Sequence, residues 1–166
     1  NRGPVTFRHD DDGGLVARRG AGGLVSGIGP LMAGSDAVWV AAAMSAADRE
    51  AAGDGVTDVE GFRFRALAVD ADRYHAFYDV IANAALWFAH HGLFDPVYEP
   101  NWPAGWVEGP WAAYRRVNER FAEAVAREAQ TEDPIVLVQD YHFALAPRMI
   151  RNRLPKATII TFWHIP

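Results

Sequence analysis

The amino-acid sequence predicts an α/β fold built around a parallel sheet, and the last third of the chain carries this prediction. A continuous apolar run, Ile135-Val136-Leu137-Val138, is typical of a strand that is buried on both faces of a parallel sheet. A helical stretch over 143–154 separates this run from a second strand over 158–162. Because a βαβ unit packs stably with a right-handed crossover, we expect a Rossmann-like parallel sheet with helices on both faces.

The first 70 residues predict a β-hairpin followed by short helices and strands. Apolar residues over 5–7 and 15–17 flank Asp12-Gly13-Gly14, a sequence suited to a hairpin turn. A short helix is expected over 24–32 and a short strand over 38–40. Ser45, with Asp48 three residues later, predicts the N-cap of a helix that runs to residue 52. A further strand is expected over 62–69, so strands and helices alternate here as well.

The middle of the chain predicts two helices with an irregular connection between them. Asp70 can cap a helix that runs through residue 78, and helical spacing continues over 79–90 until Gly92. The connection over 100–110 is rich in Pro, Gly and Trp. Apolar residues at steps of three and four then predict a long helix over 111–129.

Length and composition place the chain among soluble globular domains. It has 166 residues, half of them hydrophobic, and a formal net charge of −5, which gives no support for a nucleic-acid surface. Cysteine is absent, which excludes disulfides and thiolate zinc sites. No apolar run reaches the ~20 residues of a membrane span, and no signal-peptide pattern is present, so we expect a cytoplasmic protein. The chain opens on loop residues and stops just after a strand, which favours a fragment of a longer protein.

Two polar residues follow the two neighbouring strands of the last third. Asp140 comes directly after the first strand and His164 directly after the second. Ligands bind outside the carboxyl ends of the strands in open parallel sheets, so we expect both side chains at one binding edge. The alternative is structural: Asp140 would cap the following helix, and His164 would be a packed loop histidine.

A second candidate site lies near the N-terminus. Gly22 and Gly23 precede a predicted helix, whose first N–H groups could approach an anion. Arg2 could hold a phosphate through bidentate hydrogen bonds if it lies at the same sheet edge. The alternatives are a simple turn and a surface arginine. There is no G-x-G-x-x-G fingerprint and no P-loop Lys-Ser/Thr, which disfavours a dinucleotide-binding dehydrogenase.

Histidines and aromatic residues give weaker indications. His90, His91 and His142 do not form an H-E-x-x-H pattern, and we expect no metal site. Tyr78 and Trp87 lie nine residues apart, which puts them about 180° from each other on an ideal α-helix. They could face one pocket only if the segment is broken between them. The alternative is that they are two core aromatics on separate faces.

These pieces together resemble a known family. The matching segments, in order along the chain, are Asn1-Arg2-Gly3-Pro4-Val5, Gly22-Gly23-Leu24-Val25, Tyr78 with Asn83-Ala84-Ala85-Leu86-Trp87, Tyr114 with Val117-Asn118, Gln139-Asp140-Tyr141-His142 and His164-Ile165-Pro166. Their order and approximate spacing resemble those of trehalose-6-phosphate synthases, which are retaining glycosyltransferases with two Rossmann-like domains, the GT-B fold. The resemblance implies that residues 1–166 are part of the N-terminal, acceptor-binding domain, without its first strand and without the C-terminal nucleotide-sugar domain.

The resemblance also implies a reaction and roles for individual residues. Glucose would pass from a UDP- or GDP-linked glucose to glucose 6-phosphate with retention of configuration and without a metal ion or other cofactor. By position, Arg2, Tyr78, Trp87 and Asp140 are similar to acceptor-binding residues. Gly22 and Gly23 are similar to a donor-binding loop, and His164 to a histidine beside the transferred glucose. Asp140 and His164 would therefore act in catalysis, and the implied partners are the two substrates and the C-terminal domain of the same chain.

One departure from the family pattern concerns the acceptor. Many members carry a W-x-G-W-type segment, whereas this chain has Trp39-Val40 followed by three alanines, Ala41 to Ala43. This leaves open a relative that uses another sugar phosphate, polyol phosphate or pseudo-sugar, and also a non-catalytic binding homologue. Because the basic residues that hold the donor diphosphate would lie in the C-terminal domain, we expect the isolated chain to be inactive. The sequence leaves homo-oligomerisation open.

Overall fold

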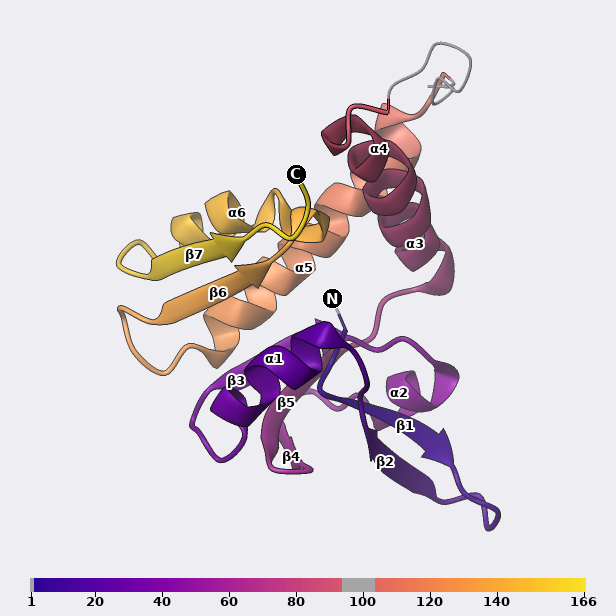
Figure 1. Ribbon diagram of the computed structural model, residues 1–166, viewed down its shortest axis with the longest axis vertical. Coiled ribbons are helices and arrows are strands. Elements are labelled where there is room, and N and C mark those ends of the chain that lie inside the picture. Colours follow the sequence, from indigo (N-terminus) through magenta and orange to yellow (C-terminus); the bar gives the residue numbers. More distant parts are fainter. Residues whose placement is uncertain (1, 94–103) are drawn as a thin grey trace. The chain divides into compact units, whose positions relative to one another are not determined.

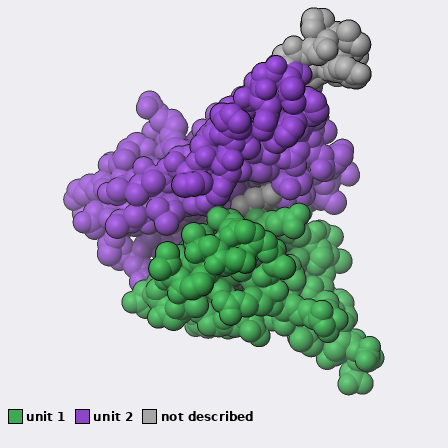
Figure 2. Space-filling model, viewed as in Figure 1, with its two compact units in different colours: residues 1–69 green, residues 70–166 purple. Residues whose placement is uncertain are grey.

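The computed structural model describes residues 2–93 and 104–166 and divides the chain into two compact units, Asn1–Val69 and Asp70–Pro166 (Figures 1 and 2). The first unit contains β1 (Val5–His9), β2 (Leu15–Arg19), α1 (Gly23–Met32), β3 (Val38–Ala42), α2 (Ala46–Ala51), β4 (Thr57–Val59) and β5 (Phe62–Leu67). The second contains α3 (Ala71–His75), the π-helix η1 (Ala76–Leu86), α4 (Trp87–His90), the π-turn η2 (Val107–Trp111), α5 (Ala112–Glu128), β6 (Ile135–Gln139), the 3₁₀ turn η3 (Tyr141–Phe143), α6 (Ala146–Arg153) and β7 (Thr158–Phe162). Asn1 and residues 94–103, the latter including the first part of the connection expected over 100–110, lie outside the described residues.

The first unit confirms the predicted hairpin, helices and strands. β1 and β2 pair antiparallel, with Val5 opposite Arg19, and Gly13 takes a positive φ of 82° in the turn. β3 and β5 pair in parallel, and α2 lies between them in sequence, capped by Ser45 and Asp48 as predicted. The core brings together α1, the hairpin and the sheet through buried residues (Val5, Val25, Trp39, Ala41, Phe62 and Phe64).

Strand β4 was not predicted from the sequence. It pairs antiparallel with β5 through a two-residue turn at Glu60 and Gly61, which have φ values of 52° and 79°. Positive φ at both central residues suits a type I′ hairpin turn, which usually carries Asn-Gly or Asp-Gly. Because Glu is unusual in this position and the strand has three residues, the hairpin pattern is missing from the sequence.

The second unit contains the predicted βαβ arrangement. β6 and β7 pair in parallel, with Leu137 opposite Ile160, and α6 connects them. α5 runs behind the strand pair in Figure 1 and packs beside α6, where Arg153 forms an ion pair with Glu123 at 3.2 Å. Its apolar side is buried as the spacing predicted, through Tyr114, Val117 and Phe121.

The prediction that the β6 strand is buried on both faces is wrong for the described residues. One face of the β6–β7 pair is at least half exposed. It carries Ile135, Leu137, Ile160 and Phe162, with exposed fractions of 72%, 53%, 50% and 58%. Val138, on the opposite face, is buried. The strand forms as predicted from the apolar run, but α5 and α6 cover only one of its two faces.

Parallel pairing occurs in two separate sheets of the described residues, β3-β5-β4 and β6-β7.

No helix within the described residues is long and apolar enough to cross a membrane.

Candidate functional site

Asp140 and His164 lie together at the carboxyl ends of β6 and β7, as the sequence predicted. The last paired residues of the two strands are Gln139 and Phe162. The Asp140 N–H donates to the Phe162 carbonyl at 2.8 Å, and the His164 N–H donates to Asp140 Oδ1 at 3.3 Å. His164 Nε2 lies 3.1 Å from Gln139 Oε1. The imidazole is exposed and the carboxylate is half-buried, so both can meet a ligand at this edge.

The Asp140 carboxylate also has the structural role that was considered as the alternative. Its Oδ1 accepts a hydrogen bond from the Tyr141 N–H at 2.9 Å and caps the short turn η3. Capping and ligand binding are compatible, because an ionised carboxylate has about four acceptor positions. The helix-cap interpretation is therefore correct and does not exclude a function for the same side chain.

The backbone of Asp140 is strained. Its φ of 71° and ψ of 172° fall in a region that is essentially restricted to glycine, at a cost of about 1–3 kcal/mol for other residues. Strain of this kind persists only where the surroundings fix the conformation, and it is concentrated at functional sites. A glycine here would relieve the strain but would remove the carboxylate. No residue pattern around position 140 indicates this backbone conformation.

Two buried side chains of α5 hold the loop that follows Asp140. The Tyr114 hydroxyl donates to the Tyr141 carbonyl at 2.7 Å and accepts from the Ala144 N–H at 3.1 Å. Asn118 Nδ2 donates to the His142 carbonyl at 3.2 Å, and its Oδ1 accepts from the Ala146 N–H at 3.0 Å. Burial raises the pKa of Tyr114 to about 12, so the hydroxyl keeps its proton. These four hydrogen bonds fix the loop on a helix.

Tyr78 and Trp87 lie on one continuous helical segment that is not broken between them. Instead, residues 76–86 wind as a π-helix, as shown by the Trp87 N–H, which donates to the Ala82 carbonyl five residues back. A π-helix holds between four and five residues per turn, so nine residues make about two turns and return close to the same face. An ideal α-helix would require a break for both side chains to reach one face, but a wider winding brings them there without one. Both are half-buried, not core residues.

Two side chains of the π-helix contact the loop that follows Asp140: Tyr78 and, five residues later, Asn83. The Tyr78 and His142 rings stack, with centroids 5.2 Å apart and planes inclined by 17°. The Tyr141 hydroxyl donates to Asn83 Oδ1 at 2.7 Å. Burial raises the pKa of Tyr141 to about 12, and the charge of Asp140 acts in the same direction. Three predicted site residues of this unit, Tyr78, Asp140 and His164, are thus linked by contacts or by one short loop.

The histidines do not form a metal centre among the described residues, where no group of three or more His, Asp or Glu side chains could hold a metal ion. His90 Nδ1 lies 2.7 Å from the Leu86 carbonyl, and His91 Nδ1 lies 2.7 Å from the Trp87 carbonyl. The His91 ring also stacks on Trp87 with centroids 3.9 Å apart. Burial lowers the pKa of His142 to about 4, so this imidazole is neutral at physiological pH.

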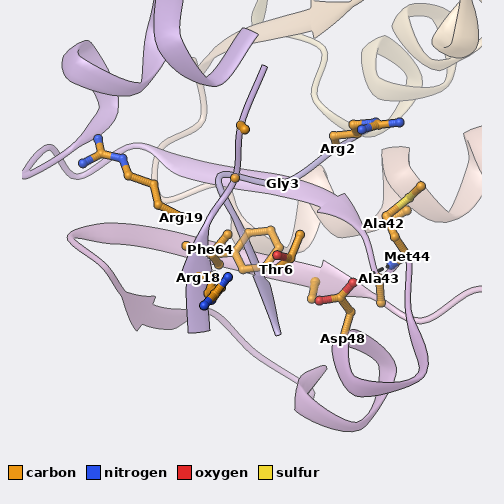
Figure 3. A pocket seen from close by; sticks show the side chains of 14 residues that line it. Arg2, Gly3, Thr6, Arg18, Arg19, Ala42, Ala43, Met44, Asp48 and Phe64 are labelled. Atoms are coloured by element: carbon orange, nitrogen blue, oxygen red, sulfur yellow. Dashed lines mark hydrogen bonds between the residues drawn. The ribbon is translucent and has the colours of Figure 1, made fainter. Parts of the chain in front are cut away.

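Arg2 lies at the rim of a cavity of about 440 Å³ in the first unit (Figure 3). This volume lies within the range of small-molecule sites, ~300–1,000 Å³. Arg18 and Arg19 of β2 also line it, and neither was singled out from the sequence. The carboxylate of Asp48 is occupied by the N–H groups of Phe7, Met44 and Ser45, at 2.6, 3.2 and 2.9 Å. The cavity therefore presents more cationic than anionic groups, which suits an anionic ligand.

The backbone around Arg2 is fixed by two contacts. Trp39, a buried residue of β3, donates its Nε1–H to the Arg2 carbonyl at 3.2 Å. At Gly3 a Cβ atom would lie 2.7 Å from the Phe64 ring, so only glycine fits this close approach. Arg2 is part of the Asn1–Val5 family segment, but nothing in that segment identifies Trp39 or Phe64 as the residues in contact with the backbone there.

The other two predicted N-terminal residues lie beside this cavity without lining it. Gly20 and Ala21 are among its lining residues, and Gly22 and Gly23 follow directly. Gly22 has a φ of 139° and is the N-cap of α1, where its carbonyl accepts from the Ser26 N–H at 2.9 Å. The helix N-terminus carries a partial positive charge, consistent with the anion interpretation. The donor-binding role of these glycines stays a prediction.

The alanines that depart from the family pattern also lie at the cavity. Ala41, Ala42 and Ala43 are all buried, and Ala42 and Ala43 line the cavity beside Arg2. Figure 3 shows both at the end of β3, where they line the cavity with small side chains. A larger side chain at either position would reduce the space available to a ligand.

Two solved structures with similar folds are trehalose-phosphate synthases. The α,α-trehalose-phosphate synthase (UDP-forming) from Burkholderia vietnamiensis matches 87% of this chain and 30% of its own, with a TM-score of 0.66 and 24% identity. The enzyme of the same description from Burkholderia xenovorans, in complex with glucose-6-phosphate, matches 89% of this chain and 31% of its own, with a TM-score of 0.63 and 24% identity. The fold is therefore that of GT-B glycosyltransferases, with an antiparallel hairpin near the N-terminus, as predicted.

The sequence comparisons identify the family. A trehalose-6-phosphate synthase from Mycobacterium sp. (strain KMS) is 35% identical over 167 aligned residues, which cover all of this chain and 32% of that protein. The chain thus spans about a third of the length of the curated relatives that it matches. The family profile of glycosyltransferase family 20 matches residues 1–166, and the chain belongs to this family.

Proposed function

We propose that this chain is the acceptor-binding domain of a retaining glucosyltransferase that forms trehalose 6-phosphate from a nucleotide-glucose and glucose 6-phosphate. The observation that carries the proposal is the pairing of Asp140 and His164 at the carboxyl ends of two adjacent parallel strands. The family membership and the names of the relatives support the same reaction. The donor would bind mainly to a C-terminal domain outside these residues, because the chain spans about a third of its relatives.

Each predicted residue has a chemical task in this proposal. Asp140 accepts hydrogen bonds from acceptor hydroxyl groups and orients the attacking oxygen, with Tyr78 and Trp87 as neighbouring walls. Arg2 neutralises the acceptor phosphate. His164 hydrogen-bonds the donor glucose, and this bond strengthens as positive charge develops on the ring in the transition state. Gly22 and Gly23 approach the donor with backbone N–H groups.

The bond changes need no protein nucleophile. The bond between the anomeric carbon and the nucleotide diphosphate breaks, and the acceptor oxygen forms the new bond on the same face of the sugar. The proton of the acceptor hydroxyl passes to the leaving phosphate. Glycosidases that retain configuration instead use two carboxyl groups about 5 Å apart. At the described β6–β7 edge, a single carboxylate, Asp140, stands beside an imidazole, which fits direct transfer better than that arrangement.

A second candidate is a transferase of the same family that uses a different phosphorylated acceptor. The small side chains of Ala42 and Ala43 favour this alternative, since they line the same cavity as Arg2 and fill little of it. The third candidate, a non-catalytic homologue, would lack the basic residues for the donor diphosphate in the downstream sequence.

The decisive assay incubates the complete protein with UDP-glucose or GDP-glucose and a panel of sugar and polyol phosphates. We expect transfer to glucose 6-phosphate with retention, and the UDP-forming solved relatives favour UDP-glucose as the donor. A consistent preference for another acceptor would establish the second candidate in place of the first. The isolated chain of 166 residues should show no turnover, and detectable transfer by it would contradict the assignment of donor binding to another domain.

Trp39 should influence phosphate binding through Arg2. The substitution Trp39→Phe keeps an aromatic ring against Phe62 but removes the hydrogen bond to the Arg2 carbonyl. A neutral hydrogen bond contributes about 1 kcal/mol, so we expect the affinity for glucose 6-phosphate to fall by about fivefold in calorimetric titration. In an Arg2→Ala background the same substitution should have no further effect. Equal effects in both backgrounds would show that Trp39 acts independently of Arg2.

A further inference from the structure

His142 lies in a column of stacked rings that connects the π-helix to the Asp140 loop. Its ring stacks on Tyr78 at a centroid distance of 5.2 Å and on Tyr141 at 4.3 Å, with interplanar angles of 17° and 28°. The column continues from Tyr78 to Tyr74 at 5.6 Å and 15°. Two of its rings come from the segment 74–78 and two from the loop that begins at Asp140, so His142 stands where the two segments meet.

Both ends of this contact are anchored independently of the rings. The backbone of His142 is held by Asn118 of α5, and the Tyr141 hydroxyl is held by Asn83 of the π-helix. The Phe77 ring lies 6.4 Å from His142 and 5.7 Å from Tyr114 and closes the column on the core side. With the surroundings fixed, the thickness of the His142 ring determines how far Tyr78 lies from the backbone of the loop.

The setting of His142 does not suit direct chemistry on a ligand. Its ring stacks with two tyrosines, and its Nε2 atom is buried within the protein. It belongs to no metal-binding group among residues 2–93 and 104–166. Burial keeps the imidazole neutral at physiological pH, so the ring can stack without carrying a charge into the core.

We propose that His142 is a positioning residue for the acceptor: its ring, stacked between Tyr78 and Tyr141, sets the separation between the π-helix face that carries Tyr78 and the loop that carries Asp140. The inference rests on the proposed function, because it takes Tyr78 and Asp140 as two sides of the acceptor site. A flat ring is the property that the position requires, since stacked aromatic pairs depend on ring geometry as well as on buried area. A side chain of similar volume without a flat ring would move Tyr78 relative to Asp140.

The test compares His142→Phe with His142→Leu in the complete protein. Phenylalanine keeps a flat ring and leucine fills the space without one, so both variants should fold. We expect the KM for glucose 6-phosphate to stay within about threefold of wild type for His142→Phe and to rise about tenfold for His142→Leu, the size expected from the loss of two stacked pairs. The KM for the nucleotide-glucose should stay within about twofold in both, and kcat should change less than the acceptor KM. His75→Leu, an exposed histidine of α3 outside the site, is the matched control and should match wild type.

A second measurement does not depend on activity. Hydrogen exchange of the amides in 76–86 and 140–144 should become faster together in His142→Leu and stay unchanged in His142→Phe. Equal acceptor KM values for the two variants, or faster exchange in one segment alone, would overturn the positioning role. The wild-type protein could transfer no glucose to glucose 6-phosphate while both segments still exchange faster in His142→Leu. In that case the proposed function is wrong, but the role of His142 in positioning the two segments is supported.

Discussion

Replacing Asp140 is expected to reduce glucosyl transfer by the complete protein by roughly 100-fold, whether the new residue is asparagine, alanine or glycine, because each removes the carboxylate that binds the acceptor. A hydrogen bond to a charged group contributes about 1.5–3 kcal/mol, and a factor of about 100, or about 2.7 kcal/mol, lies within the range of one such bond to a sugar hydroxyl. Initial rates with saturating nucleotide-glucose and varied glucose 6-phosphate measure the effect. Full activity of Asp140→Asn would show that the negative charge is not needed and would leave Asp140 a helix cap.

The same three variants should separate the function of the side chain from the strain of its backbone. Asp140→Ala and Asp140→Gly lose the same hydrogen bonds to the Tyr141 and His164 N–H groups, at 2.9 and 3.3 Å. Glycine alone relaxes the unfavourable φ of 71°, so it should be about 1–2 kcal/mol more stable than alanine in denaturant unfolding. This reverses the usual order, in which glycine is less stable by about 0.5–1 kcal/mol.

Asp72, an exposed residue in the regular helix α3, supplies the control for this comparison. There the alanine variant should be the more stable of the pair, by the usual amount. If the alanine variant is also the more stable one at position 140, as at position 72, Asp140 is not strained in solution. If the glycine variant is the more stable one at position 140 and both variants lose glucosyl transfer, the aspartate destabilises the fold and is needed for the reaction.

The strand-edge part of the site was predictable from the sequence because it depends on order along the chain. Two apolar runs with a helix between them fix a parallel pair, and whatever follows each strand must then meet at one edge. Asp140 and His164 follow from that rule alone. The predicted caps at Ser45 and Asp70 succeeded for a similar reason, since the hydrogen bonds of a cap are local.

The features that escaped prediction depend on contacts between distant segments or on backbone conformation. Nothing local distinguishes Trp39 as the donor to the Arg2 carbonyl, 37 residues away. The π-helical winding of 76–86 is invisible to an analysis that assumes about 100° per residue, which is why Tyr78 and Trp87 were expected on opposite faces. His142 was noted in a family segment and weighed as a metal ligand, but its place in a ring column requires Tyr78 and Tyr141 to be positioned first.

Replacing Asn118 with leucine should destabilise the protein by about 3–5 kcal/mol, the largest effect on stability that we expect from one substitution in this chain. Leucine has a similar volume, so the loss comes from hydrogen bonds and not from a cavity. The amide makes three of them, to the Tyr114 and His142 carbonyls at 3.0 and 3.2 Å and from the Ala146 N–H at 3.0 Å. The Asn118 side chain is fully buried, and a buried polar group that loses its hydrogen-bond partner costs about 1–3 kcal/mol.

The effect should reach the candidate site, because Asn118 holds the loop that carries His142 on one side and the start of α6 on the other. Denaturant unfolding followed by circular dichroism measures the loss, and Arg115→Leu, on the exposed side of the same helix, should stay within about 0.5 kcal/mol of wild type. In conditions where Asn118→Leu remains folded, its KM for glucose 6-phosphate should rise more than its KM for the nucleotide-glucose, since the acceptor side depends on this loop. A stable variant with unchanged acceptor binding would mean that Tyr114 alone fixes the loop, through its hydroxyl contacts to Tyr141 and Ala144.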